Sequence, residues 1–382
     1  MTNSEFCSLP FNCPTSVHAD TSFSLVLKSL ASEASWVLVT SAFWSKHETV
    51  LELLESSHSP TTVLTSVTPN PTISEVVRSA QELPFVDFIV ALGGGSVIDT
   101  AKGLAALSAI NYNTNLFHDH LTAGALLPED FSPMPVIAIP TTSGTGSEVT
   151  KWASIWGDDG AKFSLTHPAL FPKNAILDPG LCTSMPRELT LYSALDTLSH
   201  AMESIWNVKH TSVSDAFATM AIRMVKGRLI EVLENPGDKK LRSQLQTAAL
   251  FGGMAMSMTQ TAIAHAISYP LTSHLGLPHG FACGFTLPEV ARFIGERHPQ
   301  RISLIAEAFG CRNDDLTKNM VLWFRSLGVA DSIQRFALPE DIENLDCSFI
   351  NPSRSNNTLR AVDNEIARRI AVRALEQLLE ED

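Results

Sequence analysis

Short apolar runs alternate with amphipathic segments through the first half of the chain. Runs rich in β-branched and aromatic residues predict strands, and apolar positions three or four residues apart predict helices. The predicted strands cover residues 35–40, 62–67, 85–92 and 134–140, and the predicted helices cover 48–55, 73–82 and 96–109. Strands that alternate with helices are typical of a parallel sheet with helices on its faces. We therefore predict an α/β fold for this half.

The pattern changes near Pro186, after which the spacing of apolar positions is mostly helical. The predicted helices cover residues 189–207, 213–234, 240–259, 261–274, 288–297, 300–308, 316–327 and 364–379. Residues 351–357, which contain proline and several asparagines, are predicted to form a loop. We predict two domains, an α/β domain over residues 1–184 and an all-helical domain over residues 185–382.

The composition indicates a soluble globular protein. Hydrophobic residues make up 45% and charged residues 18% of the 382 residues, which is unlike a disordered chain. No apolar run reaches the roughly 20 residues of a membrane span, and the N-terminus lacks the basic start of a secretory signal. The formal net charge of −13 disfavours binding to nucleic acid or acidic membranes. We therefore expect a cytoplasmic protein that binds neither nucleic acid nor membrane.

Four polar side chains in the predicted helical half have the chemistry of a divalent-metal site. Asp196 and His200 are four residues apart in a predicted helix, so they share nearly the same face after a rise of about 6 Å. His265 and His279 follow, and the two prolines between them predict a helix, a break and a second helix. One carboxylate and three imidazoles favour a borderline ion such as Fe(II) or Zn(II) over calcium or magnesium.

The same residues also have a plainer explanation. A histidine in an apolar helix is commonly a hydrogen-bonded core residue, and an Asp–His pair at this spacing is typical of a surface ion pair. However, the apolar positions of residues 191–205 form one stripe, and Asp196, His200 and Glu203 form a separate polar stripe. Spacing alone leaves both explanations open.

A glycine-rich turn, Gly93-Gly94-Gly95-Ser96, follows the third predicted strand and opens a predicted helix. Glycines let backbone N–H groups approach an anion, and we expect Ser96 to cap a helix whose dipole favours phosphate. The turn lacks the G-x-G-x-x-G pattern, and a purely structural turn is the alternative. Because the turn lies at the carboxyl end of a predicted parallel strand, we interpret it as a phosphate-binding loop.

A second polar loop, residues 140–148, follows the fourth predicted strand. Its hydroxyls and glycines favour contact with a nicotinamide, ribose or phosphate, although a capped turn with Thr145 or Ser147 starting a helix is equally consistent. Two such loops at neighbouring strand ends predict a dinucleotide site. A nicotinamide beside a Lewis-acid metal can exchange a hydride with a carbonyl carbon.

Several short motifs follow one another along the chain: TPNPT at 68–72, GGGSVIDTAK at 93–102, PTTSGTGSE at 140–148, LDP at 177–179, LDTLSHAME at 195–203, His265, and PHG at 278–280. Together they resemble the iron-containing (group III) alcohol dehydrogenases over nearly the whole chain. The resemblance implies a dehydroquinate synthase-like architecture, with a dinucleotide-binding first domain, a helical metal-binding second domain and an active site between them. It also implies Fe(II) or Zn(II), NAD or NADP, a small alcohol or aldehyde substrate, and a homodimer.

The resemblance assigns roles to individual residues. It implies that Asp196, His200, His265 and His279 are the metal ligands, the set that spacing also suggests. It implies cofactor contacts for Gly94, Gly95, Ser96, Asp99, Thr141, Thr142, Ser147 and Lys162. The glycine loop and Asp99 would approach the pyrophosphate or ribose, the hydroxyl-bearing residues would line the nicotinamide end, and Lys162 would reach a ribose.

Two positions depart from the family pattern. Many members carry a histidine four residues after the third ligand, implicated in proton relay. Here that residue is Tyr269, whose hydroxyl can hydrogen-bond a substrate but does not titrate near neutral pH. His274 is a candidate replacement. The position of a common acidic NAD selector is Ser41, so nothing there repels a 2′-phosphate and both NAD and NADP stay open.

Three further segments resemble a phosphonate-associated branch of the family. They are SYP at 268–270, FACG at 281–284 and KW at 151–152. Members of that branch reduce phosphonoacetaldehyde to 2-hydroxyethylphosphonate, and Lys151, His167 and His274 are candidates for binding the dianionic headgroup. The alternatives are a short-chain alcohol or diol as substrate, or a lyase or synthase of the same fold that uses NAD transiently.

Overall fold

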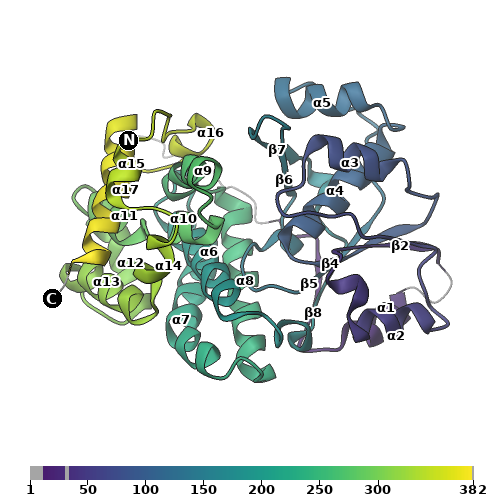
Figure 1. Cartoon of the computed structure of the whole chain (residues 1–382), viewed down its shortest axis with the longest axis horizontal. Coiled ribbons are helices and arrows are strands. Elements are labelled where there is room, and N and C mark those ends of the chain that lie inside the picture. The colour runs from purple at the N-terminus through teal and green to yellow at the C-terminus, as the bar shows by residue number, and fades with distance from the viewer. Residues whose placement is uncertain (1–11, 31–33, 381–382) are drawn as a thin grey trace, which may run out of the picture.

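A six-stranded parallel sheet organises the first half of the protein. The computed structural model describes residues 12–30 and 34–380 (Figure 1). The sheet has the order β1-β8-β5-β4-β2-β3, and every pairing is parallel. Its strands are β1 (Ser16–Ala19), β2 (Trp36–Thr40), β3 (Thr62–Leu64), β4 (Phe88–Gly93), β5 (Val136–Pro140) and β8 (Asn174–Leu177). Strands β2, β4, β5 and β8 are buried along their length, which explains their continuous apolar runs.

Helices cover both faces of this sheet. They are α1 (Phe23–Leu30), α2 (Glu48–Glu55), α3 (Ile73–Ala80), α4 (Gly95–Ala109) and α5 (Thr114–Ala123). The first two share a core with Leu38 and Val90, and the last three share a core with Val37 and Ile89. Successive strand residues therefore enter opposite cores, as a pleated strand requires. The predicted α/β architecture is confirmed.

A β-hairpin beside the sheet was not predicted. Strands β6 (Trp152–Trp156) and β7 (Lys162–Thr166) pair antiparallel, with Ser154 opposite Ser164. The alternate residues Ala153, Ile155 and Leu165 are buried in the core that α4 shares with the sheet. The other face of the hairpin is only partly buried, and it becomes one wall of the functional cleft described below.

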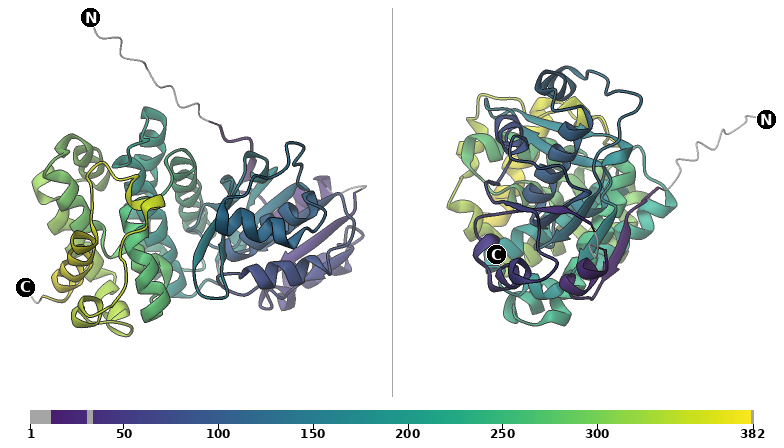
Figure 2. Two further views of the ribbon diagram at one scale, coloured as in Figure 1. Left: turned by 90° about the horizontal axis from the view of Figure 1, so that it is seen from above. Right: turned by 90° about the vertical axis from the view of Figure 1, so that its right-hand side faces the viewer.

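The second half is built from helices, with no strand element between residues 183 and 380 (Figure 2). They are α6 (Arg187–Ile205), α7 (Ser212–Glu234), α8 (Lys239–Thr259), α9 (Ile263–Leu275), α10 (His279–Gly284), α11 (Leu287–Gly295), α12 (Pro299–Phe309), α13 (Leu316–Ser326), α14 (Val329–Gln334), α15 (Pro339–Glu343), α16 (Pro352–Ser355) and α17 (Asn364–Leu379). Their apolar faces form one large core. The described helices include none that is long and apolar enough to cross a membrane. The domain boundary expected at residues 184–185 falls just before α6, and it stays a prediction.

One local prediction was confirmed and another was wrong. Helix α9 continues through Pro270 to Leu275 and ends at Gly276, which has a left-handed φ of 69°, and α10 begins at His279, so a helix, a break and a second helix follow one another as predicted. One proline removes a single backbone donor, and the buried neighbours Ile267 and Leu271 hold the helix in place. The predicted loop at 351–357 contains the one-turn helix α16, because Pro352 occupies its first turn and the side chain of Asn351 caps it.

Candidate active site

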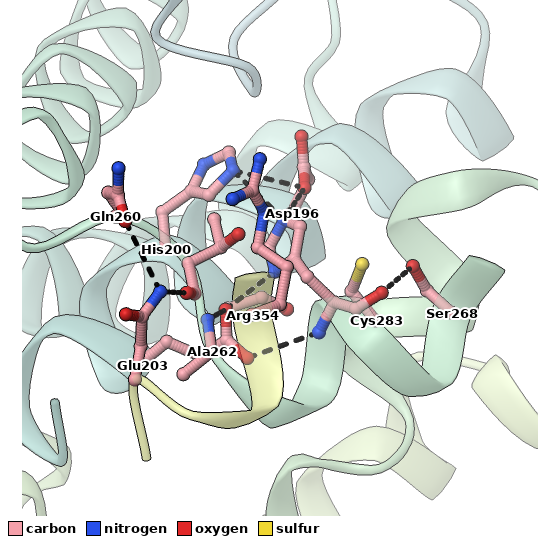
Figure 3. A network of polar contacts seen from close by, with 12 residues as sticks. Asp196, His200, Glu203, Gln260, Ala262, Ser268, Cys283 and Arg354 are labelled. Atoms are coloured by element: carbon pink, nitrogen blue, oxygen red, sulfur yellow. Dashed lines mark hydrogen bonds and ion pairs between the residues drawn. The ribbon is translucent and has the colours of Figure 1, made fainter. Parts of the chain in front are cut away.

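Asp196, His200 and His265 line one cleft between the two halves of the protein, and Figure 3 shows Asp196 beside His200. Asp196 and His200 lie one turn apart on α6, and His265 lies near the start of α9. The Oδ1 atom of Asp196 is 3.6 Å from Nε2 of His200 and 3.6 Å from Nε2 of His265. The two Nε2 atoms are 3.2 Å apart. All three side chains are buried, so their donor atoms face one small volume.

His279, the first residue of α10, joins this group because α10 packs very closely on α6. A Cβ atom at Gly280 would clash with the backbone carbonyl of Tyr192 on α6, so glycine permits the approach. The Nδ1 atom of His279 is 3.3 Å from Oγ of Ser268 on α9. The four predicted ligands, which are separated by up to 83 positions in the chain, thus line one cleft.

Cys283 also reaches the group, which the sequence did not indicate. Its Sγ atom is 3.8 Å from both ring nitrogens of His279. Donor atoms of Asp196, His265, His279 and Cys283 all lie within 4.8 Å of one another. Cys283 follows His279 by one helical turn, and this spacing is the signal that could have found it. Sulfur is a softer donor than the imidazole and carboxylate groups around it.

Glu203 orients the imidazole of His265 by contacting the ring nitrogen that faces away from the other proposed ligands. Its Oε2 atom lies 2.6 Å from Nδ1 of His265, and its two oxygens accept hydrogen bonds from the backbone N–H groups of Ala262 and His265. The carboxylate is fully buried and caps the start of α9. With Nδ1 donating to Glu203, the Nε2 lone pair of His265 is directed toward Asp196 and His200. This is the arrangement that commonly fixes a metal-ligating histidine.

Burial and neighbouring charges separate the pKa values of these groups. Burial lowers the pKa of His200, and burial together with Lys162 lowers the pKa of His279 well below its ordinary value. Burial acts the same way on His265, but Cys283, Glu203 and Asp196 outweigh it and raise that pKa well above its ordinary value. Burial would raise the pKa of Asp196, but the surrounding imidazoles, led by His200, hold it low. The low pKa of Asp196 keeps a carboxylate charge among these imidazoles, and that charge favours a cation beside it.

These residues fit a divalent metal ion. The Oδ1 atom of Asp196 is buried and has no hydrogen-bond partner within the described chain. Leaving such an oxygen unsatisfied is costly. The facing Nε2 atoms of His200 and His265 add two lone-pair donors at the same point. A carboxylate and imidazoles suit Fe(II) or Zn(II).

The glycine loop lies across the cleft from these ligands. Gly95 and Ser96 line the same cavity as Asp196 and His265. A Cβ atom at Gly95 would be only 2.6 Å from the side chain of Thr145, so glycine allows the two polar loops to pack together. The expected helix cap was wrong: Gly94 is the N-cap of α4, and Ser96 Oγ instead accepts a hydrogen bond from the N–H group of Asn70. The N–H groups at the start of α4 remain available to an anion.

The second loop is held by a buried lysine that the sequence did not single out. Lys102 is fully buried, and its Nζ atom donates to the backbone carbonyls of Ser147, Thr150 and Trp152 at 2.7–2.8 Å. Burial lowers its pKa to about 8. Glu148 lies nearby, and burial raises its pKa to about 7. The position of Lys102 in the GGGSVIDTAK motif is the sequence signal for this role.

Two residues that were expected to contact the cofactor, Asp99 and Ser147, also help to hold this loop. Asp99 accepts a hydrogen bond from Ser147 Oγ at 2.7 Å and another from the N–H group of Ser154 at 2.9 Å. Both oxygens of Asp99 are therefore engaged in joining α4 to the loop and the hairpin, although Asp99 and Ser147 do line the cleft. Thr141 is buried beside Gly93, and Thr142 lies next to Gly94.

The remaining candidates divide into two groups. Tyr269 and Lys162 line the cleft, with Lys162 Nζ 4.8 Å from the centroid of the tyrosine ring. His274 is exposed, and its Nδ1 atom lies near the Ser273 hydroxyl and the Pro270 carbonyl, so the relay predicted for it is not supported. Six other predicted site residues are also absent from the cleft lining; they are Ser41, Gly94, Thr141, Thr142, Lys151 and His167. Ser41 lies just after β2, the strand next to β4.

Two family models match this chain. The iron-containing alcohol dehydrogenase model matches residues 16–179, and the model for the C-terminal part of the Fe-containing alcohol dehydrogenase family matches residues 190–343. The chain belongs to the iron-containing alcohol dehydrogenase family. It is therefore an oxidoreductase of the NAD(P)-dependent alcohol dehydrogenase class, with a metal and a nicotinamide cofactor.

Individual relatives differ in what they act on. The chain is 37% identical to a phosphonoacetaldehyde reductase of Streptomyces viridochromogenes over 54% of its own length and 53% of that protein. It is 30% identical to a 1-propanol dehydrogenase of Salmonella typhimurium over 78% of each chain. Its fold matches the solved structure of a sulfoacetaldehyde reductase from Bifidobacterium kashiwanohense in complex with NAD+, with a TM-score of 0.85 and 26% identity. That match covers 96% of this chain and 98% of the other.

Proposed function

We propose that this protein reduces phosphonoacetaldehyde to 2-hydroxyethylphosphonate with NADH or NADPH. A hydride from the nicotinamide would be added to the aldehyde carbon, and a proton to its oxygen. The observation that carries the proposal is the shared cleft: the helix α4 N-terminus and the Asp196–His200–His265–His279 group line one cavity. A hydride donor and an oxygen-activating centre would thus reach the same carbonyl group, the first at its carbon and the second at its oxygen.

We propose Asp196, His200, His265 and His279 as the ligands of Fe(II) or Zn(II), which when bound acts as a Lewis acid toward the substrate oxygen. Glu203 keeps Nε2 of His265 directed into the cleft. Gly94, Gly95 and Ser96 present backbone N–H groups to the cofactor phosphates. Tyr269 lines the cleft and is the candidate for passing a proton toward the product oxygen, directly or through water.

Two relatives support an aldehyde with an anionic headgroup. The names of the Streptomyces and Bifidobacterium enzymes both describe a two-carbon aldehyde that carries an acidic group, phosphonate in one and sulfonate in the other. The 1-propanol dehydrogenase relative supports the alternative of a neutral short-chain alcohol. The two possibilities differ in the charge of the substrate, and a single assay separates them.

The test is metal reconstitution followed by a substrate screen. The purified protein is loaded anaerobically with Fe(II) or, separately, with Zn(II), and oxidation of NADH and NADPH is followed with phosphonoacetaldehyde, propanal and glycolaldehyde. We expect kcat/KM to be highest for phosphonoacetaldehyde. Equal or faster turnover of propanal would contradict the proposed substrate, and no net oxidation of either cofactor would favour a lyase or synthase.

The finer cofactor and assembly assignments are tested in the same samples. The ratio of kcat/KM for NADPH and NADH shows whether Ser41 leaves room for a 2′-phosphate, as we propose. Metal analysis after growth with both ions available shows which ion is loaded. Light scattering on the holoenzyme tests the proposed homodimer, and fractionation of the source cells tests the proposed cytoplasmic location.

A further inference from the structure

Arg354 enters the cleft from the distant end of the chain. It lies on α16, and its Nη2 atom donates to Oγ of Ser164 on β7 at 2.8 Å, while its Nε donates to the hydroxyl of Tyr269 on α9 at 3.3 Å. The residue is half-buried and lines the same cavity as the four proposed ligands. The guanidinium thus bridges the hairpin and the helical half at the functional cleft.

A second cation lies beside it. Lys162 on β7 has its Nζ atom 4.8 Å from the centroid of the Tyr269 ring and 5.7 Å from the centroid of the Trp156 ring. Within residues 12–30 and 34–380, no carboxylate forms an ion pair with Arg354 or Lys162. Asp99 also lines this cavity and interacts electrostatically with Lys162, but its two oxygens accept hydrogen bonds from Ser147 and Ser154. The two cations supply positive charge on either side of Tyr269.

The segment that carries Arg354 is firmly positioned. Asn357 is buried, and its side-chain amide donates to the carbonyl of Thr261 at 2.8 Å and to the carbonyl of Ser353 at 3.1 Å. The carbonyl of Asn357 in turn accepts a hydrogen bond from the N–H group of Val208. These bonds fix α16 to the loop that precedes α9. The position of the guanidinium is therefore set by buried contacts and not by a free surface loop.

Arg354 and Lys162 both contact Tyr269, which lies one helical turn after the proposed ligand His265. Tyr269, which accepts the Arg354 hydrogen bond, follows His265 by four residues on α9, a rise of about 6 Å. This is comparable to the span of a two-carbon aldehyde from its carbonyl oxygen to the oxygens of a headgroup. A substrate whose carbonyl oxygen is near His265 would thus place its headgroup near Arg354.

We propose that Arg354 is the specificity residue of this enzyme and that it binds the anionic headgroup of the substrate, with Lys162 adding positive charge and Ser164 holding the guanidinium. Arginine presents a planar fork of donors that matches phosphonate oxygens in pairs. The inference rests on the proposed function, because it names the group that recognises the charged end of the proposed substrate. The residues predicted for this role from sequence, Lys151, His167 and His274, do not line the cleft.

The first test compares an anionic and a neutral aldehyde. For Arg354→Gln, we expect the ratio of kcat/KM for phosphonoacetaldehyde to kcat/KM for propanal to fall about 100-fold, because charged hydrogen bonds to the headgroup are lost. Arg354→Lys should recover part of the ratio, and Ser164→Ala should lower it slightly. Arg228→Gln, an exposed arginine on α7 paired with Glu231, is the matched control and should leave the ratio unchanged.

The second test does not depend on turnover. Calorimetry measures binding of ethylphosphonate, an unreactive anion, to the metal-loaded enzyme with NADH. We expect Kd to rise about 100-fold in Arg354→Gln, with unchanged metal content and NADH affinity. An unchanged Kd would overturn the inference, and so would an equal loss of activity toward both aldehydes.

The outcomes separate this inference from the proposed function. If the wild type reduces propanal but not phosphonoacetaldehyde, the proposed function fails, while ethylphosphonate binding still decides the role of Arg354. If instead Arg354→Gln weakens NADPH more than NADH, the anion held by Arg354 is the 2′-phosphate of the cofactor, and the inference is overturned.

Discussion

Two regions of this protein contain buried charged groups, and they differ in whether those groups have hydrogen-bond partners. Under the second polar loop, the Lys102 ammonium is surrounded by backbone carbonyls and hydroxyls, and both oxygens of Asp99 accept hydrogen bonds. At the centre of the cleft, Asp196 Oδ1 has no hydrogen-bond partner in the described chain and lies 3.6 Å from the Nε2 atoms of His200 and His265, which face each other. Satisfied buried charges hold the structure together, whereas an unsatisfied buried oxygen is suited to binding a ligand.

Removing the unsatisfied carboxylate should have the largest effect. Asp196→Ala deletes the anionic donor of the proposed metal site, so we expect metal content and activity to fall below detection. Folding should persist, because the helix that carries Asp196 is held by the large apolar core of the helical half. Metal analysis, an NADH oxidation assay and circular dichroism measure the three quantities, with exposed Asp119→Ala as the control. Activity retained without bound metal would refute the assignment.

Removing the satisfied cation should instead affect stability. Lys102→Met leaves the carbonyls of Ser147, Thr150 and Trp152 without their donor, and we expect a loss of about 3–5 kcal/mol in the free energy of unfolding. Urea denaturation measures it. The control is Lys240→Met on the exposed start of α8, expected within about 0.5 kcal/mol of wild type. A small effect of Lys102→Met would mean that the loop does not depend on the hydrogen bonds from Lys102.

Glu203 combines features of both regions. Its buried carboxylate has hydrogen-bond partners within the protein, and it also orients the proposed ligand His265. In Glu203→Gln, the hydrogen bond to Nδ1 of His265 weakens, and we expect metal affinity to fall about 10–100-fold. Competition with a chelator measures the affinity. Glu289→Gln on α11, a buried carboxylate paired with Arg292 away from the cleft, should leave it unchanged.

The smallest expected effect concerns pH. Burial raises the pKa of Glu148 to about 7, above its value in the unfolded chain. The folded state therefore holds this proton more tightly, and the associated stability is present below about pH 4.5 and is lost as pH rises through about 7. We expect Glu148→Gln to remove ~1–3 kcal/mol of this pH dependence. Thermal unfolding of both proteins between pH 4.5 and 7.5 tests it, and parallel curves would contradict it.

Local sequence patterns determined much of the α/β half. The continuous apolar runs of β2, β4 and β5 predicted a parallel sheet, because strands buried on both faces tolerate few polar residues. Hairpin β6–β7 was missed, since half of its residues face a polar cleft and carry no strong apolar alternation. The break between α9 and α10 was predicted from the two prolines of this segment, and α9 itself continues through the first of them, Pro270, because buried neighbours hold it in place.

The sequence by itself determined which residues could form a metal site, because donor chemistry and a four-residue spacing on one helix are local properties. Only the tertiary structure decided which other side chains contact the proposed ligands or line the cleft beside them. Glu203, Cys283 and Arg354 reach it from α6, α10 and α16. Their roles depend on how closely helices pack and on which buried groups find partners. Spacing on one helix places Glu203 near Asp196 and Cys283 near His279, but their roles and the approach of Arg354 arise from contacts between segments far apart in the chain.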